Sequence, residues 1–250
     1  ITDKAKSGVF LSVLGFGTGN LKDSTMEKLA NKGNGNYAYI DSLQEGKKVL
    51  VEQMGGTLVT IAKDVKIQVE FNPAVVSNYR LVGYENRALK KEDFADDKKD
   101  AGEIGAAHTV TALYEVVLVG SMSKTVDAEP LRYSNNALQV QTADPVSLQK
   151  EMLTVKLRYK EPAGDVSKLL EFPLIDTQKK LDAASRDFQF ASAVAEFAEL
   201  LRGSKHSQAG SWESLIARAN DSRGEDRGGY RAEFVVLARK AEALIRRSDS

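Results

Sequence analysis

Apolar and polar residues alternate with a two-residue period through the middle of the chain. The segments 65–71 and 153–159 show this alternation most clearly, because each apolar residue is followed by a charged or polar one. That pattern places the apolar side chains on one face of a half-buried antiparallel strand. Further strands are expected over 79–84, 109–119 and 169–174. Residues 57–176 are therefore predicted to form an antiparallel β-sandwich or a comparable antiparallel layer.

The first part of the chain has a different pattern, in which predicted strands alternate with predicted helices. Residues 9–15 (VFLSVLG) form a continuous apolar run typical of a strand buried on both faces. Ser24 and Glu27 have capping-box spacing and open a helix expected to end at Gly33. A short strand over 37–40 follows, and a second capping box, 42–45, opens a helix expected to end at the Gly55–Gly56 pair. Strand, helix, strand and helix predict a parallel α/β unit over residues 1–56.

The last part, residues 177–250, is expected to be helical and to lie against the β domain. Its apolar residues recur at helical spacing, with charges of both signs on the opposite faces. Three stripes stand out: Phe190, Val194, Phe197 and Leu201; Trp212, Leu215, Ile216 and Ala219; and Phe234, Leu237, Ala241 and Leu244. The predicted fold class is α+β, with a partial Rossmann-like unit, an antiparallel sandwich-like domain and C-terminal helices.

Two parallel strands cannot complete the sheet that the first part implies, because they leave edges and faces uncovered. We expect the chain to start within a domain, with further strands preceding Ile1. Packing of this half-unit on the sandwich or on another copy of the chain is the alternative.

Composition narrows the function classes. The chain has 35 basic and 35 acidic residues, a formal net charge of +0 and no cysteine. A neutral balance removes the electrostatic footprint of a nucleic-acid-binding protein. Thiolate metal sites, disulfides and cysteine nucleophiles are excluded, and the two histidines, His108 and His206, are too few for a histidine-rich metal centre. No apolar run approaches the length of a membrane-spanning helix.

A glycine-rich loop is the first candidate site. Gly15, Gly17 and Gly19 follow a predicted strand and precede a helix, and Asp41 ends the next strand, as in a dinucleotide-binding fingerprint. Asn20 stands where the third glycine is expected, and three residues separate the loop from the capping box. The candidate binding residues are Gly17, Thr18, Gly19 and Asn20. Two readings stay open, a nucleotide-binding loop that uses Asp41 and a turn-forming loop.

Two polar segments are further candidates. The acidic run 92–100 contains five carboxylates, but Lys98 and Lys99 interrupt the spacing of a calcium loop, which favours a solvated loop. Glu85, Arg87 and His108 either form a small polar binding site or a salt-bridged corner that fixes the loop 88–107. No serine lies in a nucleophile-elbow context, so hydrolase chemistry has no support.

Longer stretches resemble a known family. The segment from SGVFLSVLGFGTGN to IQVEFNP, residues 7–73, resembles the last strands and helices of a bacterial von Willebrand factor type A (vWA) domain. The rest resembles the uncharacterised C-terminal domain that follows vWA in the YfbK-like family of bacterial envelope proteins. The stretches that carry the likeness are YRLVGYENRAL (79–89), DAGEIGAAHTVTALYE (100–115), LRYKEP (157–162), FASAVAEFAELLRGS (190–204) and GYRAEF (229–234).

The resemblance implies a non-enzymatic protein that binds a protein partner. vWA domains hold a divalent metal, Mg²⁺ in the intact parent, through an Asp-x-Ser-x-Ser motif and later Thr and Asp residues, all of which fall outside this chain. No metal or other cofactor is therefore expected here, and the partner protein is unknown. The family also implies the cell envelope, periplasmic or lipid-anchored. Self-association through the C-terminal helices is a further possibility.

Overall fold

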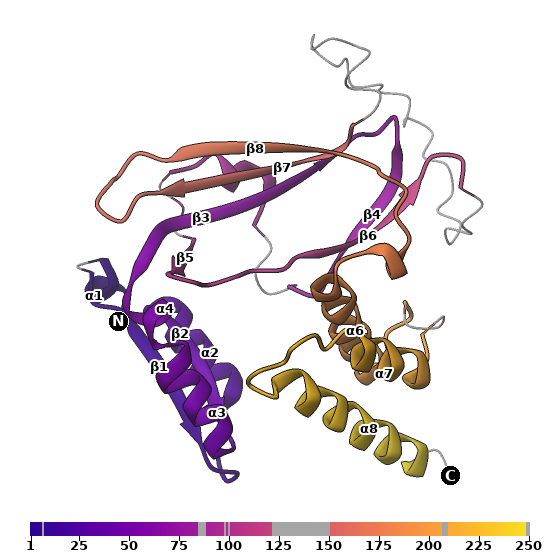
Figure 1. Cartoon of the computed structure of the whole chain (residues 1–250). Coiled ribbons are helices and arrows are strands. Elements are labelled where there is room, and N and C mark those ends of the chain that lie inside the picture. Colours follow the sequence, from indigo (N-terminus) through magenta and orange to yellow (C-terminus); the bar gives the residue numbers. More distant parts are fainter. Residues whose placement is uncertain are drawn as a thin grey trace. The chain divides into compact units, whose positions relative to one another are not determined.

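A computed structural model describes residues 1–6, 8–84, 89–97, 99, 101–121, 151–206 and 210–248 (Figure 1). Helices and antiparallel sheets are mixed, which confirms the α+β class. The chain divides into two compact units, each described by itself below. Unit 1 contains Ile1–Asn72, Ala88–Val110 and Glu151–Leu174, and unit 2 contains Pro73–Arg87, Thr111–Lys150 and Ile175–Ser250.

Unit 1 begins with the predicted parallel pair. After the short helix α1 (Thr2–Lys6), β1 (Leu11–Phe16) pairs in parallel with β2 (Asn34–Ile40), and Phe16 lies opposite Ile40. The helix α2 (Asp23–Lys32) connects them and ends at Gly33 as predicted. Its predicted capping box is wrong. Lys22 occupies the N-cap position without a side-chain hydrogen bond, and Ser24 lies inside the first turn.

The second capping box is confirmed, because the Ser42 hydroxyl accepts a hydrogen bond from the Glu45 N–H at 3.2 Å. The helix that follows does not stop at the glycine pair. It continues as α3 (Leu43–Lys47), a π-helical turn η1 (Lys48–Glu52) and α4 (Met54–Leu58). The two glycines lie within α4, where Gly56 meets a strand of the sheet.

That sheet has four strands in the order β5-β3-β7-β8. The strands are β3 (Thr60–Phe71), β5 (Gly102–Gly105), β7 (Glu151–Lys160) and β8 (Lys168–Ile175). β3 pairs antiparallel with β5 and β7. Lys63 lies opposite Lys160, and Lys66 lies opposite Arg158, so β3 has one extra residue in this interval. Asp64 adopts φ 50° there, which marks a β-bulge.

Unit 2 contains an antiparallel ribbon and three helices. β4 (Val76–Val82) pairs with β6 (Leu113–Leu118), so β6 is shorter than the predicted strand 109–119. After the 3₁₀ turn η4 (Leu181–Ala183) come α6 (Arg186–Leu201), α7 (Trp212–Asp221) and α8 (Tyr230–Ser248). Ser185 and Ser211 cap α6 and α7 by accepting backbone N–H bonds at 3.2 and 3.1 Å.

The predicted apolar stripes of these helices lie only partly in the core of unit 2. The stripe members in or against the buried cluster are Phe190, Phe197, Trp212, Leu215, Ile216, Ala219 and Phe234. The prediction is wrong for Val194, Leu201, Leu237 and Leu244, which are exposed. Phe197 contacts both Trp212 and Phe234 edge to face, with ring centroids 5.8 and 5.2 Å apart. The buried residues between the helices are Ala193, Leu215, Ile216, Ala219, Val235 and Ala238. Alanines at three of these six positions let the helix backbones approach closely.

Candidate functional site

The glycine-rich loop lies at the carboxyl ends of the parallel strands. Gly17 follows β1, Asp41 follows β2, and the pairing of Phe16 with Ile40 brings both positions to one edge. The Tyr39 hydroxyl donates a hydrogen bond to the Gly17 carbonyl at 2.8 Å, and Gly17 adopts φ 81°. Residues 17–20 are exposed. This edge is where open α/β sheets hold ligands.

The charge beside this loop is unfavourable for a phosphate. The first turn of α2 carries Asp23, whose carboxylate accepts a hydrogen bond from the Tyr37 hydroxyl. That bond raises the pKa of Tyr37 to about 12. A phosphate bound at this helix end would lie close to the Asp23 carboxylate, whose charge opposes an anion there. The geometry therefore supports a turn-forming loop better than a nucleotide cradle.

The proposed polar corner is only partly visible. Glu85 and Arg87 lie outside the described residues, so their relation to His108 stays a prediction. His108 is exposed in the turn after β5, and its backbone N–H donates to the Gly105 carbonyl at 3.1 Å.

The acidic run was expected to be a solvated loop, and Glu92, Asp96 and Asp97 are indeed exposed, but its backbone also contacts the sheet. Residues 91–97, 99 and 101, here called the strap, start with the 3₁₀ turn η3 (Lys91–Phe94) and lie on cations of the sheet. Lys66 donates to the Asp96 carbonyl, and Lys160 donates to the Asp97 carbonyl at 3.0 Å. Lys66 is only 2% exposed. The strap thus covers the polar face of β3 and β7.

Carboxylates of unit 1 complete these contacts. Lys160 Nζ lies 2.6 Å from Asp64 Oδ2, and Asp64 Oδ1 accepts the Ala101 N–H at 3.3 Å. The hydrogen bond that Lys160 donates to Asp64 raises the pKa of Lys160. A hydrogen bond with Ser167, followed by the charges of Arg158, Lys160 and Lys66, lowers the pKa of Asp97. These charges are paired within the chain, which indicates a structural role for the strap.

Metal binding by the acidic run finds no geometric support. Among the residues that the structure describes, no group of three or more carboxylates or histidines has the arrangement to hold a metal ion. Asp93 instead pairs with Lys99 at 3.3 Å. Asp100 and Lys98 lie outside the described residues.

The other face of the same sheet is apolar and open. Ile67 pairs with Leu157, and Val69 pairs with Val155, on the face opposite Lys66 and Arg158. We call this surface the apolar sheet face; its members are Ile67, Val69, Phe71, Leu153, Val155, Leu157, Leu170, Phe172 and Leu174. The β8 members belong to it because Glu171, between them, points to the polar face, with Oε1 3.6 Å from Lys156 Nζ.

Exposure on this face rises toward β8. Every residue of β8 is exposed, including Leu170 at 40%, Phe172 at 54% and Leu174 at 46%. β8 also ends the strand order and forms the outer edge beside β7 (Figure 1). Strand periodicity predicted the alternation but could not tell which face is covered, so sequence reasoning missed this surface.

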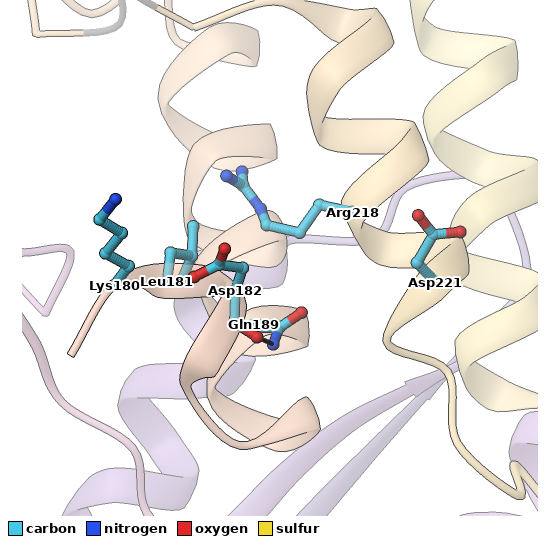
Figure 2. A pocket seen from close by; sticks show the side chains of 6 residues that line it. All are labelled: Lys180, Leu181, Asp182, Gln189, Arg218 and Asp221. Atoms are coloured by element: carbon cyan, nitrogen blue, oxygen red, sulfur yellow. Dashed lines mark hydrogen bonds between the residues drawn. The ribbon is translucent and has the colours of Figure 1, made fainter.

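Unit 2 has an open hollow of about 530 Å³ beside its helices (Figure 2). Arg218 and Asp221 of α7 face Gln189 of α6 and the segment Lys180–Asp182. Gln189 donates to the carbonyls of Asp182 and Ala184 at 3.2 and 3.0 Å, and Arg218 pairs with Glu196. Gln189 thus holds the segment before α6, and Arg218 ties α7 to the middle of α6.

A buried carboxylate ties the ribbon of unit 2 to α6. Glu199 is 8% exposed, and its Oε2 lies 3.5 Å from Arg80 NH2 on β4. Arg80 Nε also pairs with Glu115 Oε2 at 2.6 Å, and this hydrogen bond raises the pKa of Arg80. The arrangement joins three elements within one unit and has the character of a structural ion pair.

Comparison with known families matches residues 56–244 to the family described as "Uncharacterized protein YfbK, C-terminal". The chain belongs to the YfbK C-terminal family. It is 42% identical over 244 residues to the "Uncharacterized protein YfbK" of Escherichia coli (strain K12). The match covers 98% of this chain and 41% of that relative, so the chain spans about two fifths of the relative's length.

The predicted resemblance to the YfbK-like C-terminal domain is thereby confirmed, whereas the vWA assignment of residues 1–56 stays a prediction. No solved structure matches the chain. Within the described ranges, no helix has the length and apolar character needed to cross a membrane.

Proposed function

We propose that this YfbK-family chain is a non-enzymatic protein-interaction module that binds protein partners through the apolar sheet face. The observation that carries the proposal is the exposure of β8, where Leu170, Phe172 and Leu174 stand together at an open sheet edge. Contiguous exposed apolar patches of this kind mark protein interaction sites. An open strand edge adds backbone donors and acceptors that a partner strand can use.

We further propose that residues 1–56 are the C-terminal part of a vWA domain in a bacterial envelope protein, periplasmic or lipid-anchored. The parallel β1–β2 pair with its connecting helix supports this assignment. So does the start of the family match at residue 56, together with the greater length of the relative. In such a parent, Mg²⁺ would be held outside this chain, and its open position would take a partner carboxylate.

Site-specific photo-crosslinking in the cells that produce the protein tests the interaction surface. A photoreactive phenylalanine replaces Phe172, which is 54% exposed, and a matched control replaces Phe188 on α6, which is 48% exposed. The proposal expects a discrete adduct, identified by mass spectrometry, from position 172 and none from position 188. Equal labelling at both positions, or no adduct at either, would contradict it.

A further inference from the structure

The partner that fits β8 is suggested by its backbone. In a strand, the N–H and C=O groups of alternate residues point to opposite sides. Pro173 lies within β8 and has no N–H, and a proline in a sheet is accommodated at an edge strand with its nitrogen facing outward. Leu169, Glu171 and Ile175 share its alternation, so their backbone groups also point away from β7 and are open to another strand.

These outward groups restrict how a second β8 can pair. In an antiparallel pair, hydrogen bonds join an outward residue of one strand to an outward residue of the other. The two-fold axis between the two copies must therefore pass through one residue, which lies opposite its own copy. We call this residue the crossing point. Crossing at Phe172 sets Phe172 against its own copy and Leu170 against Leu174 of the second copy. On the other face, Leu169 meets Ile175, and Glu171 meets Pro173. Every apolar side chain of the sheet face then meets an apolar one.

Charge selects the same crossing. With Phe172 at the centre, Lys168 lies opposite Asp176, the residue that follows β8. Crossing at Glu171 would place two carboxylates directly opposite each other, which is unfavourable. Crossing at Leu170 would set Lys168 against Phe172, and crossing at Pro173 would set Leu170 against Asp176. The strand is therefore self-complementary in one register.

We propose that the chain self-associates by antiparallel pairing of β8 with β8 of a second copy, centred on Phe172. This inference rests on the proposed function and names a second copy as the partner. The pairing joins two four-stranded sheets across a two-fold axis and makes their apolar faces continuous. Pro173 has no N–H, so each Glu171–Pro173 pair makes one backbone hydrogen bond instead of two, whereas each Leu169–Ile175 pair can make both.

Cysteine substitution tests the register, because the natural chain contains no cysteine. In a non-hydrogen-bonded pair, facing Cα atoms lie about 4.5 Å apart, within the range of a disulfide. Phe172→Cys is expected to form a disulfide-linked dimer under mild oxidation. Leu174→Cys is the matched control, since its own copy would lie four residues along the strand, about 13 Å away. Mixing Leu170→Cys with Leu174→Cys is expected to give the mixed dimer.

Sedimentation analysis provides the second arm. The natural chain is expected to show a concentration-dependent dimer, and Phe172→Glu is expected to be monomeric with an unchanged circular dichroism spectrum, because position 172 is exposed. A monomeric natural chain, or cysteine dimers that form equally well at positions 172 and 174, would overturn the pairing. In that case, an adduct of position 172 with a different protein would leave the proposed function standing, and its absence would remove both.

Discussion

Two glycines meet where α4 passes β5. A side chain added at Gly105 would drive its Cβ into the Gly56 carbonyl oxygen, and one added at Gly56 would lie 2.9 Å from the Ala106 carbonyl oxygen. Both contacts are with backbone, which cannot move aside as the end of a side chain can. The sequence predicted that the Gly55–Gly56 pair ends a helix. The structure instead gives Gly56 a packing role inside α4.

Gly105→Ala should therefore destabilise unit 1. We expect a loss of about 1–3 kcal/mol in the free energy of unfolding, the usual cost of overpacking, measured by urea denaturation. Gly102→Ala is the matched control in the same strand, because a Cβ there has no neighbour within 4 Å. Equal stability of the two variants would show that the approach of α4 to β5 is not tight in solution.

At the scale of elements, the strap gives unit 1 a pH dependence. The pKa of Asp97 is lowered in the folded state by Ser167 and the nearby cations. Its ionised form is thus favoured by folding, so its contribution to stability is present above the unfolded pKa, about 3.9. That contribution is lost as the pH falls through the lower folded value.

Hydrogen exchange of residues 93–97 between pH 3 and pH 6, corrected for the intrinsic exchange rate, measures this effect. Protection should fall at the acid end in the natural chain, because a protonated Asp97 no longer pairs with Arg158. In Asp97→Asn, protection should be lower and flat across the range. Glu92→Gln, an exposed position on the same strap, should behave like the natural chain. The idea fails if Asp97→Asn retains the acid transition.

Much of the element order was predictable because local patterns decide it. The three C-terminal helices followed from their apolar stripes, and the parallel pair β1–β2 followed from a continuous apolar run with an intervening helix. Capping-box spacing predicted the first residue of a helix correctly in one case and wrongly in the other. Ser42 caps α3 as its spacing suggested, whereas Ser24 does not cap α2, which begins at Asp23.

Long-range contacts were beyond sequence reasoning. The extra residue at Asp64 and the contact of Asp64 with Lys160, 96 positions away, depend on the register of β3 and β7. Alternation in 65–71 defines two faces but does not tell which is covered. We expected a half-buried strand, and Val65, Val69 and Phe71 are half-buried whereas Ile67 is exposed; the strap on the polar face was not expected. The cations Lys66, Arg158 and Lys160 all lie on the polar face. Their number was the feature of the sequence that could have indicated an acidic segment packed on that face.

For the whole molecule, the family match names no activity, so the proposed binding of other proteins rests on the charge balance and the exposed β8. The neutral net charge gives no general attraction to an anionic polymer. Exposed apolar side chains on β8 then provide a short-range driving force for association. The choice of partner would then depend on the strand register and on a small number of charges, including Lys168 and Asp176. Long-range electrostatic attraction would contribute little.

The last prediction tests whether the chain binds a nucleotide at the glycine-rich loop instead of associating with proteins. Titration with NAD or ATP, followed by calorimetry and thermal shift, should give no saturable response, because Asp23 places a carboxylate in the first turn of α2 and pairs with Tyr37. A ligand that binds only the folded state would raise the melting temperature by mass action. A saturable shift that Asp41→Ala weakens about tenfold, or about 1.4 kcal/mol, would restore the nucleotide-binding interpretation. Asp23→Asn separates two reasons for the lack of binding. If the charge of Asp23 alone repels phosphate, this variant should bind NAD or ATP weakly. If the loop does not have the geometry to bind phosphate, the variant should show no binding either.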